Sequence, residues 1–247
     1  MNSNWHTQIF VITAMNLRNI GQRWGASLVA VFGVACVVGV FVAVLSMATG
    51  FQRTMSNAGT PDRVIFMRAG AATEMSSGLS YEQTQLIERL PGIAKENDQP
   101  LSSAELFVVV DIAKPGAEAS ANVSLRGVQP GAFRVRDNVR IIAGRNFSPG
   151  RNELIVGRSA QRQFANLALG SKIKLGQTEW QVVGVFSEDA GLAESEIWCD
   201  VKILQGTYRR GNSYQAVRAK IAGPESLAEL QAAIARDPQF IVDVRLE

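Results

Sequence analysis

The chain has 247 residues, with 25 lysines and arginines against 22 aspartates and glutamates, and a formal net charge of +3. The basic residues are scattered along the chain, which excludes the clustered patch that nucleic-acid binding needs. The only histidine, His6, lies near the N-terminus, so the large C-terminal part has no Ser–His or Cys–His pair for nucleophilic catalysis.

Residues 1–24 predict a helix that lies along the cytoplasmic membrane interface. Phe10, Ala14, Leu17 and Trp24 fall on one side at helical spacing, and the polar residues lie mostly elsewhere. This pattern is typical of an amphipathic helix that contacts membrane lipid. A short solvated tail is the alternative.

The run Gly25–Phe51 contains no charged residue and predicts one transmembrane helix. A helix of that length rises about 40 Å, more than the roughly 30 Å of bilayer hydrocarbon. A cleaved signal peptide is the main alternative, but its apolar core runs only about 7–15 residues. A buried helix of a soluble protein is seldom apolar all round. Since Cys36 lies in this run and Cys199 beyond it, no intrachain disulfide can form, and the outer domain depends on its hydrophobic core.

Basic residues near the run predict its orientation. Arg18 and Arg23 precede it with no acidic residue nearby, whereas Arg53 is followed by a mixed pair of charges. The positive-inside rule then leaves the N-terminus in the cytoplasm and residues 52–247 outside. We expect Trp24, with the two preceding arginines, to anchor the segment at the interface.

Small residues form a stripe along the predicted membrane helix. Ala35, Gly39 and Ala43 are spaced four apart and so share one face. Such a face lets another helix approach closely, from a second copy or from another part of the protein. The alternative is that small residues are simply common in membrane helices.

The outer part predicts an α+β domain of two modules. The first module, residues 60–143, has the order strand, helix, strand, strand. Ser80 is the N-cap of its helix, with Gln83 as the capping-box partner. The predicted elements are strand Arg63–Arg68, helix Tyr81–Leu90, and strands Glu105–Ala113 and Ala121–Val128.

A second module, residues 144–223, is predicted as an insertion. Residues 224–247 then supply a helix and a last strand that complete the first module's sheet; pairing of that strand inside the second module would contradict the division. The predicted elements are strand Glu153–Gly157, helix Arg158–Leu167, a hairpin of Ser171–Leu175 and Glu179–Phe186, helix Asp200–Tyr208, strand Tyr214–Ala222, helix Pro224–Ala235 and strand Phe240–Leu246.

No pattern in the chain predicts catalysis, a cofactor or a metal ion. There is neither a phosphate-binding Walker sequence nor a glycine-rich dinucleotide turn. One loose acidic cluster is expected to be a solvated loop, because its spacing does not match a calcium loop. A cation site is the alternative for this cluster, which comprises Glu188, Asp189, Glu194, Glu196 and Asp200.

An ordered set of short motifs resembles one protein family. The motifs are Gly144-Arg145-Asn146-Phe147, then Asn152-Glu153-Leu154-Ile155-Val156-Gly157, then Leu169-Gly170-Ser171-Lys172-Ile173, and Val182-Val183-Gly184-Val185-Phe186. This order is similar to that of the periplasmic core of ABC-transporter permeases of the MacB, FtsX and lipoprotein-release type. Asn16-Leu17-Arg18-Asn19 also resembles the family's opening, and the resemblance covers nearly the whole chain.

The glycines of these motifs predict structural turns. Gly144 and Gly170 suit turns with positive φ, and Gly184 suits a bulge or a close contact within a strand. Gly157 ends the second motif and is expected to be structural as well. The chain has Gly170-Ser171 where the family commonly has Gly-Asp, and serine still serves in a turn.

The resemblance implies a non-catalytic permease subunit of the inner membrane, with a periplasmic domain at residues 52–247. A separate cytoplasmic ATPase would drive movements of a permease dimer, which the membrane helices would transmit to the periplasmic domains for efflux or extraction of a substrate. The implied partners are that ATPase, a second permease copy and a periplasmic adaptor.

Length separates the chain from typical members of the family. Such permeases continue through three further membrane helices, so the chain resembles the N-terminal portion of one, and the missing helices would explain the small-residue stripe. The alternative is a single-pass, membrane-anchored periplasmic binding or sensor module. Further hydrophobic segments encoded in frame downstream would distinguish the two.

Overall fold

The computed structural model describes residues 5–20, 24–56, 62–116, 119–189, 191–223 and 225–247. Side chains at positions 6, 16–20, 26 and 51–56 lie outside this description. The chain divides into two compact units, Met1–Ser56 and Asn57–Glu247.

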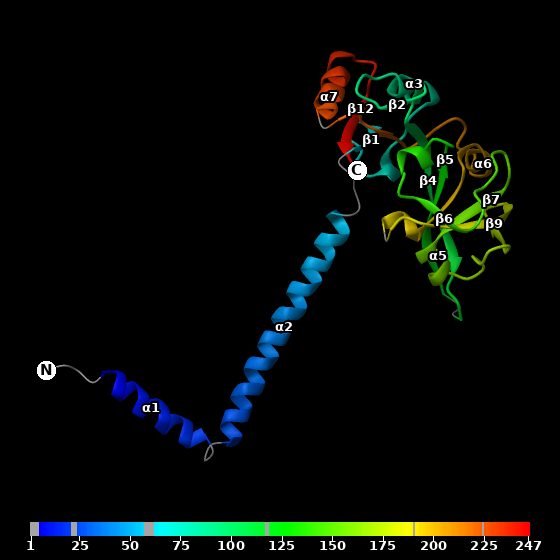
Figure 1. Cartoon of the computed structure of the whole chain (residues 1–247). Helices are drawn as coiled ribbons and strands as arrows, with labels where there is room; N and C mark the ends of the chain where they lie inside the picture. The colour runs from blue at the N-terminus through cyan, green and yellow to red at the C-terminus, as the bar shows by residue number, and fades with distance from the viewer. Residues whose placement is uncertain (1–4, 21–23, 57–61, 117–118, 190, 224) are drawn as a thin grey trace. The chain divides into compact units, whose positions relative to one another are not determined.

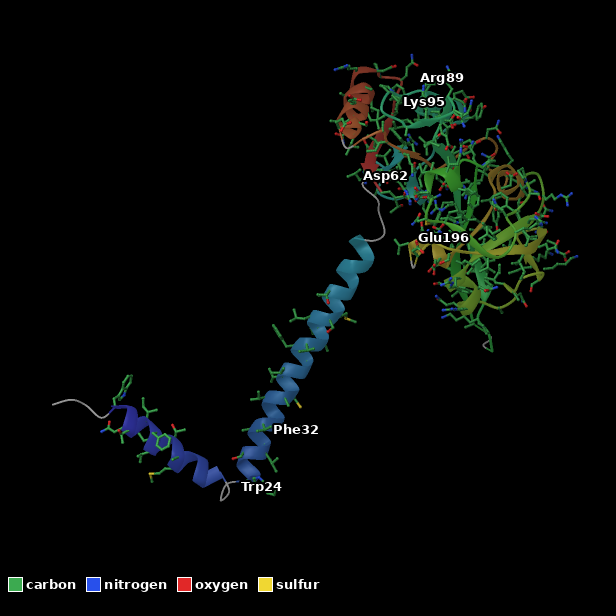
Figure 2. All side chains as sticks on the ribbon, in the orientation of Figure 1. Trp24, Phe32, Asp62, Arg89, Lys95 and Glu196 are labelled. Atoms are coloured by element: carbon green, nitrogen blue, oxygen red, sulfur yellow. The ribbon has the colours of Figure 1, made fainter. Side chains whose placement is uncertain are left out.

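The N-terminal unit consists of two helices, α1 (Trp5–Ile20) and α2 (Trp24–Ser56). The predicted membrane segment lies within α2, whose apolar part is Ser27–Gly50, with a mean hydropathy of 3.0. Figure 2 shows the side chains of α2, among them Trp24 and Phe32, projecting from the helix all round. The helix is therefore apolar on every side along this stretch, as a lipid-facing helix is.

The second unit is an α+β domain, which confirms the predicted fold class (Figure 1). Its strands are β1 (Arg63–Arg68), β2 (Lys95–Glu96), β3 (Gln99–Pro100), β4 (Ser102–Ala113), β5 (Ser120–Val128), β6 (Arg140–Gly144), β7 (Glu153–Gly157), β8 (Lys172–Leu175), β9 (Thr178–Ser187), β10 (Glu196–Asp200), β11 (Ala216–Lys220) and β12 (Val242–Leu246). Its helices are α3 (Tyr81–Glu88), α4 (Ala132–Val135), α5 (Arg158–Gln163), α6 (Val201–Thr207) and α7 (Ser226–Arg236), with 3-10 turns η1 (Glu74–Ser76) and η2 (Leu192–Ser195).

Ten of these strands form one mixed sheet in the order β12-β1-β11-β4-β5-β10-β7-β9-β6, with β8 paired to β9. The β10–β5 and β7–β9 pairs are parallel and the other pairs in the sheet are antiparallel. The pair β2–β3 forms a separate small ribbon. First and last strands of the domain, β1 and β12, are direct neighbours.

Each face of the sheet has a different composition. One face carries the main hydrophobic core, which includes Phe66, Leu106, Leu125 and Trp180 and is covered by α3, α5, α6 and α7. The opposite face carries two smaller apolar clusters, one around Trp198 and one around Ile65. Charged side chains occupy the space between these two clusters, as described below.

Most predicted elements are present. The differences lie in the ends of some elements, in elements that the sequence did not predict, and in the pairing of the strands. Ser80 and Gln83 form the predicted capping box, in which the Gln83 amide donates to Ser80 Oγ at 3.3 Å and the Ser80 amide to Gln83 Oε1 at 2.9 Å. The predicted helix Arg158–Leu167 ends earlier, at Gln163. Strands β2, β3, β6 and β10 and the short helix α4 were not predicted.

Strand pairing also differs from the predicted two-module division. β11, which the sequence places in the inserted module, lies between β1 and β4. β12 pairs with β1, a strand of the first predicted module. β5 pairs with β10, so hydrogen bonds join the two sequence segments along the sheet. The two-module division remains a prediction.

Candidate functional site

Helix α2 is the first candidate functional element, because it is long and apolar enough to cross a bilayer. Ala35, Gly39 and Ala43 lie on this continuous helix and are all exposed. A Cβ added at Gly39 would meet no atom within 4 Å beyond the nearby helix backbone. Trp24 begins α2 and is 70% exposed. Arg18 belongs to α1, with its side chain outside the described residues, and Arg23 also lies outside them.

The domain's first and last strands meet at one edge of the sheet. The Glu247 amide donates to the Arg63 carbonyl at 3.1 Å, next to the β1–β12 ladder. Arg63 is buried, and its guanidinium donates to Asp137 Oδ1 at 3.0 Å and Asn138 Oδ1 at 2.8 Å. Lys220 Nζ reaches Asp137 at 2.6 Å. The segment after α4 is thereby bound to the end of β1 that follows the membrane helix in sequence.

A buried ion cluster extends from this edge to the middle of the sheet, with Glu105 of β4 at its centre. The Glu105 carboxylate is fully buried and accepts hydrogen bonds from three arginines: Arg136 at 2.7 and 2.9 Å, Arg218 at 2.6 Å and Arg126 at 3.1 Å. These arginines come from α4's C-terminus, β11 and β5. One carboxylate thus connects three elements that are distant in sequence.

Three more carboxylates complete the ion cluster. Arg126 forms a bidentate pair with Glu196, through bonds of 2.8 and 2.7 Å. Arg218 bonds to Glu74 and, at 2.6 Å, to Glu247. Glu74 also accepts from Arg126 at 2.6 Å. The cluster therefore contains four carboxylates and three guanidiniums. Arg126 and Arg218 each bind carboxylates from three different segments of the chain.

Aromatic rings pack against the arginines of the ion cluster. The Arg136 guanidinium lies 4.9 Å from the Trp198 ring, and that of Arg126 lies 5.1 Å from Phe107. The Trp198 indole N–H donates to Glu196 at 2.7 Å. These contacts keep water away from the charges and fix the planes of the guanidiniums.

Electrostatics keep the ion cluster charged across the ordinary pH range. Burial alone would raise the pKa of Glu105, but the guanidiniums of Arg136, Arg218 and Arg126 outweigh it and hold that pKa far below its usual range. Burial alone would also raise the pKa of Glu74. The charges of Arg126 and Arg218 outweigh burial and lower that pKa to about 2. Glu105 and Glu74 are therefore fixed negative charges near neutral pH.

The motif glycines lie where backbone geometry excludes a side chain. Gly144 and Gly170 have φ of +70° and +84°. A Cβ at Gly157 would stand 2.1 Å from the Glu194 carbonyl oxygen, and one at Gly184 would stand 2.1 Å from the Arg145 carbonyl oxygen. The β7–β9 register shifts next to Gly184. Gly157 and Gly184 thus set close approaches between β7, β9 and their loops, whereas Gly170 serves a turn with no atom near an added Cβ.

Two charged residues of the motifs form a second ion pair. The Arg145 guanidinium binds both carboxylate oxygens of Glu153 at 2.7 Å, and the Ser148 amide donates to the same carboxylate at 2.8 Å. The hydrogen bonds from Arg145 are the main cause that lowers the pKa of Glu153 to about 2. Arg145 and Glu153 thus hold the loop after β6 against β7.

The expectation of a solvated acidic loop is wrong for its central members. Glu194 and Asp200 are buried, and Glu196 pairs with Arg126 inside the ion cluster. Asp200 caps α6 by accepting from the Lys202 amide at 2.7 Å. For Glu196 the neutralising partner is 70 residues away in sequence, which spacing alone could not reveal. Among the described residues no group of three or more His, Cys, Asp or Glu is placed to hold a metal ion.

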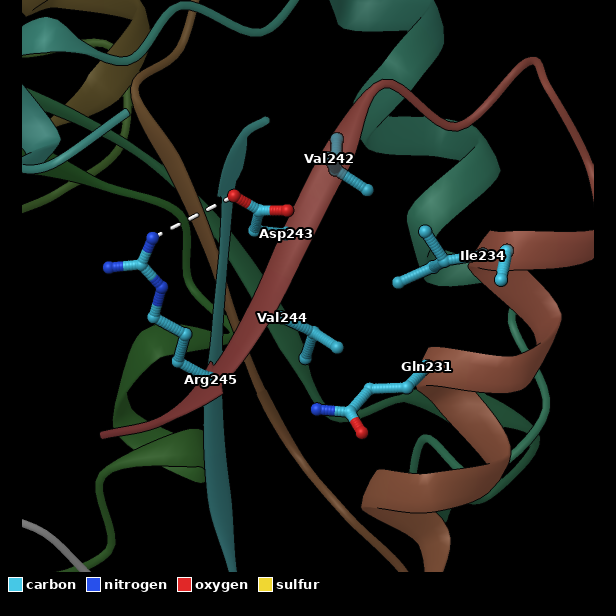
Figure 3. Close-up of a pocket in the computed structure, with 7 residues that line it drawn as sticks. Gln231, Ile234, Val242, Asp243, Val244 and Arg245 are labelled. Atoms are coloured by element: carbon cyan, nitrogen blue, oxygen red, sulfur yellow. Dashed lines mark ion pairs between the residues drawn. The ribbon is translucent and has the colours of Figure 1, made fainter. Parts of the chain in front are cut away.

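A groove of about 340 Å³ lies between α7 and the edge strand β12. Figure 3 shows Val242 and Val244 pointing from β12 toward Ile234 and Gln231 of α7, while Asp243 and Arg245 lie on the other side of the strand. Asp243 and Arg245 pair with each other at 3.7 Å. The groove is lined by apolar side chains, by Gln231 and by this charged pair, and the pair's charges offset each other.

Comparison with known proteins places this arrangement in a family. The MacB-like periplasmic core domain matches residues 27–237, which is most of the chain. The chain belongs to this family. It is therefore a MacB-like domain of the kind found in ABC-type transporter permeases.

Solved structures share the fold at low sequence identity. The periplasmic region of MacB from Actinobacillus actinomycetemcomitans aligns with a TM-score of 0.55 at 12% identity, covering 78% of this chain and 91% of that one. The extracellular domain of the noncanonic ABC-type transporter YknZ from Gram-positive bacteria aligns with a TM-score of 0.49 at 15% identity, covering 75% and 99%. No curated protein matches the chain.

The resemblance found by the short motifs is thereby confirmed, but the sequence analysis missed the ion cluster. Its signal was a charged residue inside each of three predicted strands, Glu105, Arg126 and Arg218. A charged residue in a largely apolar strand indicates either the solvent face or a buried ion pair, and only the strand pairing distinguishes them.

Proposed function

We propose that the chain is the N-terminal part of a permease subunit that transmits ATPase-driven motion across the inner membrane to its periplasmic domain, for efflux or extraction of a periplasmic substrate. In this proposal residues 1–24 lie at the cytoplasmic interface, α2 crosses the membrane, and residues 52–247 are periplasmic. ATP hydrolysis belongs to a separate cytoplasmic subunit, and the permease itself is not catalytic.

The observation that carries the proposal is the pairing of β1 with β12. β1 follows α2 in sequence, so a movement of the membrane helix reaches the domain first at β1. Five cross-strand pairs join β1 to β12, from Val64–Leu246 to Arg68–Val242. A pull on one strand is therefore shared with the other through backbone hydrogen bonds, which resist sliding along the strand direction.

Helix α2 supports a partnership within the membrane. Its Ala35, Gly39 and Ala43 face is exposed in the chain by itself, and small residues at this spacing favour close helix packing. We assign this face to contact with a second permease copy or with further membrane helices. A periplasmic adaptor is a candidate partner for the domain.

The test is purification of the protein from its own membrane. A tag placed at the chromosomal locus allows isolation in mild detergent, followed by identification of bound proteins by mass spectrometry. We expect an ABC ATPase subunit and a second, untagged copy of the permease when both forms are expressed. Recovery of the chain with neither would overturn the proposal and favour the single-pass binding or sensor module.

A further inference from the structure

Strand β4 changes its partner in the middle. Its residues Ser102–Glu105 pair with β11, and its residues Leu106–Ala113 pair with β5. Among the described strands, these two pairings share no residue of β4. The sheet therefore consists of a first half-sheet (β12, β1, β11 and residues 102–105) and a second half-sheet (residues 106–113, β5, β10, β7, β9, β6 and β8), joined by the continuous backbone of β4.

Glutamine side chains continue the hydrogen bonding where each partner strand stops. Past the end of β5, Gln129 Oε1 accepts from the Ala104 amide at 2.8 Å. Before the start of β11, Gln215 Oε1 accepts from the Phe107 amide, and the Gln215 amide donates to the Glu105 carbonyl at 2.9 Å. These bonds satisfy backbone groups of β4 that have no partner strand, but they add no strand-to-strand ladder across the junction.

Glu105 is the last residue of the first pairing, and its carboxylate crosses the junction. It binds Arg218 of the first half-sheet and Arg126 of the second, and also Arg136 after α4. Glu74 bridges Arg218 and Arg126 a second time. The ion cluster thus spans the junction at which the β4–β11 ladder ends and the β4–β5 ladder begins.

We propose that Glu105 is a positioning residue that holds the two half-sheets in one relative orientation. Separation of the half-sheets would leave buried charges without partners, which costs far more than loss of an exposed ion pair. The directional bonds of three guanidiniums also restrict rotation about β4. The inference deepens the proposed function, because a displacement of β1 and β12 then moves β5 and β10 with them.

The test measures the distance between the half-sheets in the full chain. Spin labels are placed at Glu229→Cys on α7 and Lys174→Cys on β8, both exposed, in a Cys36→Ala background; Cys199 is buried. Double electron–electron resonance in lipid nanodiscs should give one narrow distance distribution. With Glu105→Gln, we expect the distribution at least to double in width or to gain a second maximum, as two orientations become populated.

Glu153→Gln is the matched control, because Glu153 is also buried and bidentate to an arginine, but both partners belong to the second half-sheet. We expect the native width with this variant. An unchanged width in Glu105→Gln, or equal broadening in both variants, would overturn the inference.

A second variant keeps the test decisive if Glu105→Gln does not fold. Arg218→Met removes the guanidinium that the first half-sheet contributes to Glu105, while Glu105 stays bound to Arg126 and Arg136. It should broaden the distribution as well, and a native width would overturn the inference. These measurements need no ATPase, so their failure is distinguishable from failure of the proposed function, which the purification tests.

Discussion

At the residue scale, the domain contains polar and backbone arrangements that tolerate little change. Glu105 has no exposed surface and is stable as a carboxylate only because three guanidiniums surround it. Gly157 and Gly184 allow a carbonyl oxygen to approach where any side chain would collide. Both kinds of site join segments that are far apart in sequence, so each position reports on the assembled fold.

Replacement of Gly157 by alanine should destabilise the domain. The new Cβ would stand 2.1 Å from the Glu194 carbonyl oxygen, so β7 and η2 would have to separate. Forced repacking of this kind typically costs about 1–3 kcal/mol. We expect a fall in the thermal unfolding midpoint of roughly 3–10 °C, measured by circular dichroism.

Gly206→Ala is the control for that substitution, because Gly206 lies in α6 with no neighbour within 4 Å of the added Cβ. Alanine is favoured over glycine in a helix by about 1 kcal/mol, so this variant should be as stable as the native chain or more so. Equal midpoints for Gly157→Ala and the native chain would show that β7 and η2 are not packed as described.

Acid should weaken the domain through its paired carboxylates. The pKa of Glu74 and that of Glu153 fall from 4.5 to about 2 on folding. The unfolded chain therefore binds more protons over this range, so stability rises with pH there. The contribution of both groups is complete above pH 4.5 and is lost as the pH falls to about 2.

The measurement is the thermal midpoint at a series of pH values from about 6 down to about 2. In Glu153→Gln the fall with acid should be smaller than in the native chain, since one titrating pair is gone. Identical pH profiles for the two proteins would contradict the assignment of the Arg145–Glu153 pair to this effect.

At the element scale, the sequence correctly predicted the strands whose limits depend on neighbouring residues. β1, β7 and the β8–β9 hairpin were predicted almost to their ends, because apolar periodicity and turn glycines specify them. β10 was missed because its sequence, Glu196 to Asp200, begins and ends with an acid. Arg126 satisfies Glu196 from 70 residues away, and the Lys202 amide at the start of α6 satisfies Asp200. The distant Arg126 partner cannot be read from the local sequence.

The small-residue face of α2 belongs to this scale as well. Gly39→Leu would place a large side chain on the face proposed to contact another helix, and should weaken association by on the order of 1 kcal/mol. Crosslinking of α2 through Cys36, in membranes carrying the tagged permease, measures that association. Val37→Leu, on the opposite side of the helix, should leave the crosslinking yield unchanged. Equal crosslinking yields in both variants would show that the small residues form no helix contact and only reflect the usual composition of membrane helices.

At the scale of the whole molecule, the sequence predicted the fold class and the family but not the way in which the sheet is joined. Short motifs around Gly144 to Gly184 sufficed for the family, since they are local and ordered. The position of β11 between β1 and β4 depends on pairings more than 100 residues apart in sequence, and no periodicity encodes them. The Glu105 junction follows from those pairings and so became visible only in the structure.

The arginines on the two sides of α2 should control the orientation of the chain in the membrane. Arg18 and Arg23 precede α2, and Arg53 lies near its other end. Because the positive-inside rule counts lysines and arginines close to the membrane, Arg18→Gln with Arg23→Gln should yield a mixed population of the two orientations, and Arg53→Gln should strengthen the native orientation.

The measurement is labelling of Lys174→Cys, in a Cys36→Ala background, by a membrane-impermeant thiol reagent. Complete labelling from the periplasmic side is expected for native flanks and partial labelling for the double variant. Labelling only after the inner membrane is opened would place residues 52–247 in the cytoplasm, and a periplasmic domain would then be excluded.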